Sequence, residues 1–224
     1  MPLSGVETTV WNVIDRVARV APTVRRGYGI GMRRPLLTVL TTLIATSAAM
    51  ASTASAAAPK DFGGIGVVIA SGTFAPFTPG ATASTYDTEL VPEGARAHVF
   101  GLSEANLGTV TVLTVTGLLP DREYGAHAHT KPCGPTGDAA GPHFQYEQDP
   151  VTPSVDPAYA NPDNEIWLDF TTDMAGNAFA LSKVDWSFGE RRARSVVVHE
   201  THTHTESGQA GMAGTRPGCV NVAF

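Results

Sequence analysis

The stretch GTVTVLTVTGLL, residues 108–119, is rich in β-branched residues and repeats with a period of two. Successive side chains of a strand point to opposite faces of its sheet, so this pattern predicts a half-buried β-strand. Similar runs lie at ARAHVFGL (95–102), YGAHAHT (124–130), EIWLDFTTD (165–173), NAFALSKVDWSF (177–188), SVVVHE (195–200) and CVNVAF (219–224). Turn-forming sequences such as LPDRE and DMAGN separate several of them. Short strands with such turns between them predict an all-β protein, an antiparallel sandwich or barrel.

The N-terminal part of the chain has the layout of a secretory signal peptide. Arg33 and Arg34 precede an apolar stretch that reaches Met50, and small residues then end in an A-x-A sequence at 54–56. The apolar stretch is short for a membrane span, which is the alternative. We therefore expect residues 32–56 to be a cleaved export signal and no membrane anchor to remain.

Three further boundaries follow from composition. A signal peptide normally begins a chain, so we expect residues 1–31 to be an upstream extension that precedes the true start at residue 32. Residues 57–83 are rich in alanine, glycine, threonine and proline and are expected to be an extension or linker, with a strand at GIGVVIASGTF as the alternative. The folded domain is then predicted at 84–224.

Charge excludes one class of partner. Residues 1–56 hold six arginines, one glutamate and one aspartate, so their removal lowers the formal net charge from −6 to about −10. The remainder contains no basic run of the kind that binds nucleic acid. An anionic substrate would have to be attracted by local positive charge.

Cys133 and Cys219 are the chain's two cysteines. Export places them in a compartment where disulfides persist, and a bond between them would close a long loop. The chain-entropy model gives such a bond about 4–5 kcal/mol of stabilisation. Two free buried thiols are the alternative.

Histidines concentrate in the segment 124–144. His127 and His129 are two residues apart in a predicted strand, so both imidazoles project from one face and can offer two nitrogens to a metal. His143 follows a Gly-Pro bend, and His199 ends an apolar strand in which a buried imidazole needs a partner. Imidazoles without thiolates suit copper or zinc, with Cu(II) preferred; a polar strand face without metal is the alternative. The long connections 130–164 and 201–218 adjoin these histidines and are predicted to be functional.

The motifs GAHAHT, AGPHF, VVVHE and AGMAGTRPGC occur in this order and resemble the copper-zinc superoxide dismutase family, in its secreted bacterial type, over residues 91–224. The resemblance implies an immunoglobulin-like Greek-key β-sandwich or flattened barrel. It implies that His127, His129 and His199 bind copper, and that His143 is the histidine that bridges copper to zinc. It also implies that Arg216 guides the superoxide anion, and that Cys133 and Cys219 tie the long loop to the last strand.

The chain departs from the family at zinc. The family supplies two further histidines after the bridging one, but none lies between His143 and Asp169. Structural zinc normally has four ligands, so zinc binding is doubtful and we expect a copper-only protein. Asp169 is either a turn or hydrogen-bonding residue beside the site or a remnant of the zinc site without a role. Some carboxylate must orient His143, and the candidates are Asp169, Asp138 and Glu147.

The resemblance implies an exported enzyme that disproportionates superoxide to dioxygen and hydrogen peroxide, with copper delivered by a donor. Two alternatives belong to other classes: a non-catalytic copper-buffering protein of the cell envelope, and a sandwich that has lost its metal. His202 and His204 form another H-x-H pair, which takes copper transiently, fills a vacant metal position or is solvated. The loop between His199 and Arg216 is shorter than is usual in the family, which would leave copper more open.

Overall fold

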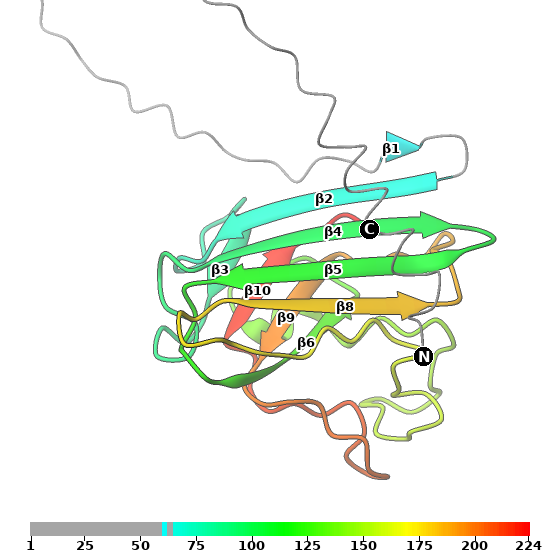
Figure 1. Ribbon diagram of the computed structural model, residues 1–224. Coiled ribbons are helices and arrows are strands. Elements are labelled where there is room, and N and C mark those ends of the chain that lie inside the picture. The colour runs from blue at the N-terminus through cyan, green and yellow to red at the C-terminus, as the bar shows by residue number, and fades with distance from the viewer. Residues whose placement is uncertain (1–59, 62–64) are drawn as a thin grey trace, which may run out of the picture. The chain divides into compact units, whose positions relative to one another are not determined.

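The computed structural model describes residues 60–61 and 65–224, which form two antiparallel sheets packed face to face (Figure 1). The first sheet has the order β1-β2-β4-β5-β8, with bounds β1 (Lys60–Asp61), β2 (Ile65–Thr73), β4 (Arg96–Glu104), β5 (Gly108–Thr116) and β8 (Ala178–Val184). The second has the order β3-β10-β9-β6-β7, with bounds β3 (Ala83–Thr85), β10 (Gly218–Asn221), β9 (Ser195–His199), β6 (Glu123–His129) and β7 (Phe170–Thr171). The described residues hold one 3₁₀ turn, η1 (Gly137–Ala140). The predicted all-β sandwich is confirmed.

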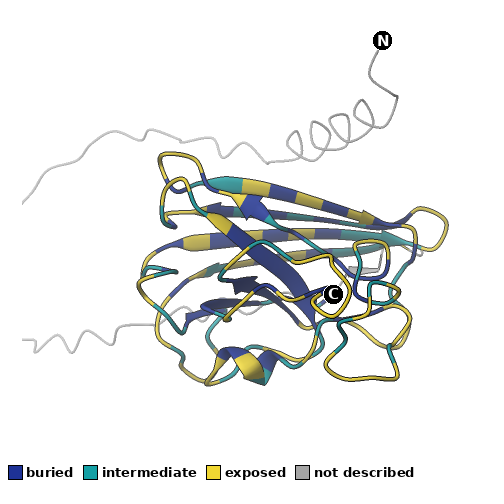
Figure 2. Ribbon diagram, turned by 90° about the horizontal axis from the view of Figure 1, so that it is seen from below, coloured by how far each residue is buried: buried dark blue, intermediate teal, exposed yellow. Residues whose placement is uncertain are grey.

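The core lies between the sheets and is built from one face of each strand. Val99 of β4 and Leu113 of β5 face Ala126 of β6 and Val198 of β9, and all four are buried. β4 alternates between buried and exposed positions, whereas β9 is buried along its whole length (Figure 2). Both faces of β6 and β9 are therefore covered, one by the core and the other by the long loops.

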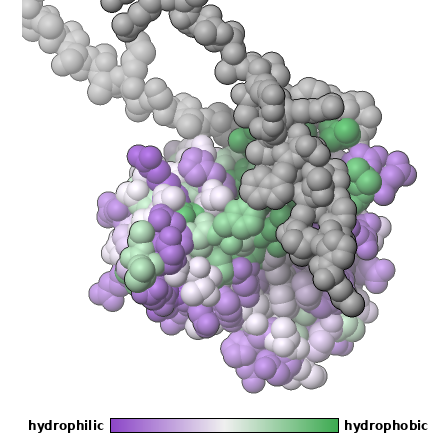
Figure 3. Space-filling view, viewed as in Figure 1, coloured by the Kyte–Doolittle hydropathy of each residue, from purple (hydrophilic) through white to green (hydrophobic). Residues whose placement is uncertain are grey.

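The outer face of the first sheet exposes apolar side chains in one row. Ile69, Phe100, Val112 and Leu181 are register partners across β2, β4, β5 and β8. Three of them, Ile69, Phe100 and Leu181, are exposed, and Figure 3 shows hydrophobic surface over the middle of this sheet. His127, His129 and His199 project on the opposite side of the sandwich, outside the second sheet.

The extension expected at 57–83 is wrong for the segment that forms β2. Residues 65–73 pair with β4 over the full length of both strands, from Ile65 opposite Glu104 to Thr73 opposite Arg96. Val68 and Ala70 of β2 are buried in the core. Gly72 permits the chain to pass closely, because a Cβ there would lie 2.5 Å from the Cβ of Ala83. The composition that suggested a linker thus belongs to a strand with small residues.

The strand expected at 165–173 is shorter than predicted. Only Phe170–Thr171 forms a strand, while Glu165 and Trp167 make isolated bridges. The alternation is nonetheless real, since Ile166, Leu168 and Phe170 enter the core. The intervening side chains turn toward the loops instead.

A disulfide joins Cys133 to Cys219, 86 residues apart, which confirms the predicted pairing. It ties the loop after β6 to β10. The predicted upstream extension (1–31) and export signal (32–56) lie outside the described residues. Within the described part of the chain, no helix has the length and apolar character needed to span a bilayer.

Candidate metal centre

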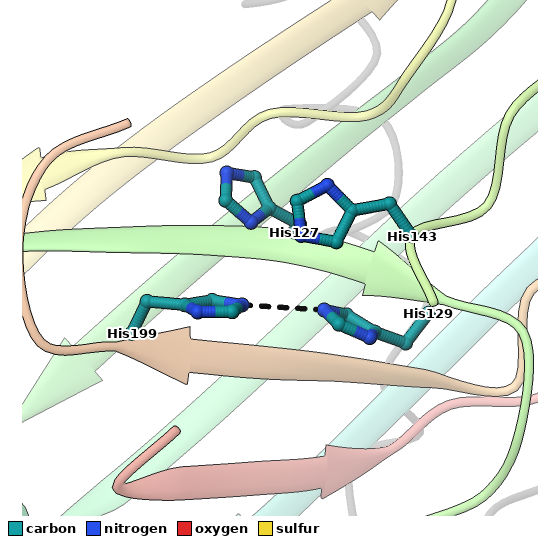
Figure 4. Close-up of side chains that lie close together, drawn as sticks. All are labelled: His127, His129, His143 and His199. Carbon is teal, nitrogen blue, oxygen red and sulfur yellow. Dashed lines mark hydrogen bonds between the residues drawn. The ribbon is translucent and has the colours of Figure 1, made fainter. Parts of the chain in front are cut away.

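Four imidazoles converge outside the second sheet. His127 and His129 come from β6, His199 from β9, and His143 from the loop after β6 (Figure 4). One ring nitrogen of each can be chosen so that all four lie within 4.8 Å of one another. The structure therefore brings together the whole set that was predicted from the sequence; their ligation of copper stays a prediction.

Strand pairing places three of these imidazoles side by side. In β6, Ala126 and Ala128 enter the core, so His127 and His129 project from the opposite face. β9 pairs with β6 so that His199 lies opposite Gly125, and the Nε2 atoms of His129 and His199 are 3.2 Å apart. A side chain at position 125 would collide with the chain, because a Cβ there would lie 2.6 Å from the carbonyl oxygen of Thr201. Glycine is thus required where the loop crosses this strand.

Groups outside the cluster bond one nitrogen on each of three rings and leave the other nitrogen to the four histidines themselves; on His129 that other nitrogen is Nε2, 3.2 Å from His199 Nε2. His127 Nε2 lies 2.6 Å from Thr203 Oγ1, His129 Nδ1 lies 2.9 Å from the carbonyl oxygen of Gly141, and His143 Nδ1 lies 2.7 Å from Glu165 Oε2. The nitrogens that remain are Nδ1 of His127 and Nε2 of the other two. Nδ1 of His127 is buried and has no hydrogen-bond partner among the described residues. Such an atom is costly unless something binds it, so the donor set fits a metal ion.

The environment keeps three of the rings neutral. Burial lowers the pKa of His127, His129 and His199 well below the ordinary imidazole value, and the electrostatic influence of the neighbouring His143 and Arg216 lowers it further. Because only the unprotonated ring can ligate a metal, these side chains are ready for binding at neutral pH.

Glu165 orients His143, and the sequence analysis did not name it. Its carboxylate is 1% exposed and accepts from His143 Nδ1, from Trp167 Nε1 at 2.7 Å and from Gln145 Nε2 at 2.8 Å. None of the three predicted candidates, Asp169, Asp138 and Glu147, bonds to His143 in the described part of the structure. The available signal was the alternation in EIWLDF, which puts Glu165 on the face opposite the core residues.

Asp169 lies beside His127, a different member of the group of four histidines. Its Oδ1 accepts the backbone N–H of Ala126 at 3.1 Å, and its two oxygens accept from the hydroxyl and the backbone N–H of Thr203. Asp169 Oδ1 lies 3.6 Å from His127 Nε2. These contacts agree with the hydrogen-bonding alternative for Asp169.

Arg216 lies beside the histidines and is linked to them through one carbonyl group. Its Nη1 donates to the carbonyl oxygen of Gly141 at 2.7 Å, and the same oxygen accepts from His129 Nδ1. Burial lowers the pKa of Arg216 somewhat, and the carboxylate of Asp138, 3.7 Å from Nε, opposes that change. A Cβ at Gly137 would lie 2.5 Å from Cβ of Arg216, so glycine is needed for this approach.

A cavity of about 710 Å³ opens onto the cluster. His143, His199, Glu165 and Arg216 line it at the histidine end. One wall comes from residues 148–155 and another from residues 211–216, so both connections that were predicted to be functional border it.

The second H-x-H pair is not part of the group of four. His202 Nε2 donates to the carbonyl oxygen of Phe170 at 3.0 Å. His204 is half-exposed, with Nδ1 3.5 Å from Glu206 Oε2. These contacts favour the solvated alternative for His204, while His202 is held by the backbone.

No protein-family model and no curated protein matches the chain. Among solved structures, it is similar to a Cu/Zn superoxide dismutase from Brucella abortus, with 17% identity over 71% of this chain and 99% of that chain and a TM-score of 0.48. It is also similar to a double mutant of a SOD-like protein from Bacillus subtilis, with 15% identity over 56% of this chain and 87% of that one and a TM-score of 0.41. A single mutant of that protein shows 14% identity over 56% and 88%, with a TM-score of 0.43. Likeness at these identities concerns the fold alone.

Proposed function

We propose that this chain is an exported, copper-only superoxide dismutase, which converts superoxide to dioxygen and hydrogen peroxide. The observation that carries the proposal is the group of four imidazoles, with one nitrogen of each within 4.8 Å of the others, at a cavity that Arg216 also lines. A storage site needs neither Arg216 nor His143. The family resemblance of the four motifs points to the same activity.

The donor set supports copper. Three neutral imidazoles and a fourth ring, with no thiolate among them, suit Cu(II), which the affinity series also favours. The bond from His143 Nδ1 to Glu165 supports a single metal, because that nitrogen is the one that a second ion would use. These four rings would hold copper, which would supply one-electron redox chemistry.

The protein's own residues supply charge and protons. Arg216 holds positive charge at the cavity and attracts the anion against a negative net charge. His143 keeps its Nδ1–H bonded to Glu165. When its Nε2 is released from the metal on reduction, that nitrogen takes a proton from solvent and delivers it to the reduced anion, and solvent supplies the second proton of hydrogen peroxide. The carboxylate of Glu165 stabilises His143 when both nitrogens carry protons.

Two observations support an extracytoplasmic location. Residues 32–56 have the layout of an export signal, and the Cys133–Cys219 disulfide is of the kind that persists in oxidising compartments. Copper would then be loaded by a donor outside the cytoplasm.

The test offers copper and zinc together to the purified protein, and measures bound metal and superoxide decay on one sample. We expect one copper, negligible zinc and fast decay. Copper without decay would contradict dismutation and indicate the copper-buffering protein. Stoichiometric zinc would contradict the copper-only proposal, and no bound metal would indicate a sandwich that has lost its site.

Replacing Arg216 with alanine is expected to lower kcat/KM about tenfold and to flatten its dependence on ionic strength, because steering by local charge is lost. Superoxide decay at several salt concentrations measures both. Arg192 is exposed and does not line the cavity, so Arg192→Ala makes the same change in net charge and should leave the rate unchanged. An Arg216→Ala variant with the wild-type rate and salt dependence would refute the role of Arg216 in attracting superoxide.

A further inference from the structure

Thr203 connects a predicted copper ligand to a carboxylate that does not reach it directly. The residue lies in the loop between β9 and β10, and its Oγ1 is 2.6 Å from His127 Nε2. The same hydroxyl donates to Asp169 Oδ1 at 2.8 Å, and the backbone N–H of Thr203 donates to Asp169 Oδ2 at 2.7 Å. The distance between His127 Nε2 and Asp169 Oδ1 is 3.6 Å, which is too long for a hydrogen bond.

The direction of these bonds follows from the number of protons. A threonine hydroxyl has one hydrogen, and a carboxylate oxygen only accepts. Since the hydroxyl donates to Asp169, its oxygen must accept the proton on His127 Nε2. His127 Nδ1 then has no proton, and it is one of two buried imidazole nitrogens without a hydrogen-bond partner among the described residues, the other being His199 Nδ1.

We propose that Thr203 is the positioning residue that fixes His127 in the tautomer with Nε2 protonated, so that Nδ1 alone faces the metal. Asp169 sets the direction of the hydroxyl. Its other contact, to the backbone N–H of Ala126, anchors the carboxylate to β6 next to the ligand itself. The hydrogen bonds from His127 through Thr203 to Asp169 therefore return to β6 at Ala126, the residue before His127.

The same contact attaches a loop to the metal centre. Residues 201–218 carry Arg216 and one wall of the cavity, and Thr203 holds the beginning of this loop against β6 and Asp169. The residue that bonds to His127 is therefore also one of the contacts that fix the beginning of this loop. This inference rests on the proposed function only in that the four histidines bind copper; it does not require dismutation.

The test compares Thr203→Val, which removes the hydroxyl and keeps the shape, with Thr203→Ser, which keeps the hydroxyl. Cu(II) affinity is measured by competition with a chelator, and the copper-loaded proteins are compared by electron paramagnetic resonance. We expect Thr203→Val to bind copper about 10- to 100-fold more weakly with a changed Cu(II) spectrum, and Thr203→Ser to resemble wild type. Thr205→Val is the control, because Thr205 is exposed in the same loop and makes no side-chain bond among the described residues.

A second readout needs neither copper nor a variant. Nitrogen-15 NMR of the metal-free wild-type protein should show His127 protonated at Nε2. A proton at Nδ1, a Thr203→Val protein with wild-type affinity and spectrum, or a Thr203→Ser protein as weak as Thr203→Val would each overturn the proposal. Wild-type protein that shows the Nε2–H tautomer and binds no copper would instead contradict the proposed function and support the assignment of the tautomer.

Discussion

Replacing Glu165 with glutamine is expected to lower kcat/KM for superoxide about 10- to 100-fold while the protein keeps its copper. Glutamine has one oxygen where glutamate has two, and it carries no charge. Its NH₂ group would face the NH₂ of Gln145, which now donates to Glu165 Oε1. Gln145 is not free to turn around, because its own Oε1 accepts the backbone N–H of Asp149 at 3.0 Å. The variant therefore loses the negative charge beside His143. It also loses the hydrogen bond from Gln145 that holds the side chain at position 165.

Superoxide decay and copper content on the same samples measure this effect. The matched control is Glu147→Gln, since Glu147 is exposed in the same loop and makes no side-chain bond in the described structure. It makes the same change in charge and should have the wild-type rate. A copper-loaded Glu165→Gln enzyme with full activity would show that His143 does not need this carboxylate for proton transfer.

Replacing both Cys133 and Cys219 with serine is expected to lower the stability of the metal-free protein by about 4–5 kcal/mol. The loop they close spans 86 residues, so most of the effect arises because the disulfide restricts the unfolded chain. For a domain of this size, the melting temperature should fall by roughly 10–20 °C. Thermal unfolding followed by circular dichroism measures the difference.

The wild-type protein under reducing conditions provides the control. Its melting temperature should equal that of the double-serine variant. The site should be affected too, because Cys133 begins the segment that leads to Gly141 and His143, and its N–H is held by Asn221 Oδ1 at 2.9 Å. A double variant that melts at the wild-type temperature would mean that the packing of Val197 and Ala140 around Cys219 holds this loop without the covalent bond.

Alternation predicted β5 and β9 well, but it overestimated the strand at 165–173 and gave only a weak signal for β2. β5 and β9 coincide closely with their runs, because branched residues there meet neighbours on both sides. β2 was missed because Gly66, Ala70 and Gly72 dilute its pattern; its strand conformation depends on the nine pairs it makes with β4, which are not a local property of the sequence.

Some residues of the candidate metal centre could be predicted from the sequence and others could not. The pair His127 and His129 could be read from the period of a strand, and family motifs added His143 and His199. Glu165 and Thr203 could not be assigned, because each reaches a histidine that lies 22 and 76 residues away in the chain. Spacing shows which face a residue is on, but the folding of two long loops decides which polar side chains meet there.

The cavity wall formed by residues 148–155 contributes none of the four imidazoles. Within it, Ser154 Oγ donates to Asp149 Oδ2 at 2.7 Å, and the backbone N–H of Asp149 donates to Oε1 of Gln145, which lies outside the wall. Asp149 connects this wall to the imidazoles through Gln145, Glu165 and His143, whereas residues 151–155 make no hydrogen bond to any of these last three side chains in the described structure. A lineage, or an engineer, can therefore lengthen, shorten or change the charge of residues 151–155 and alter which molecules reach the four histidines, while the bonds that orient His143 are left as they are.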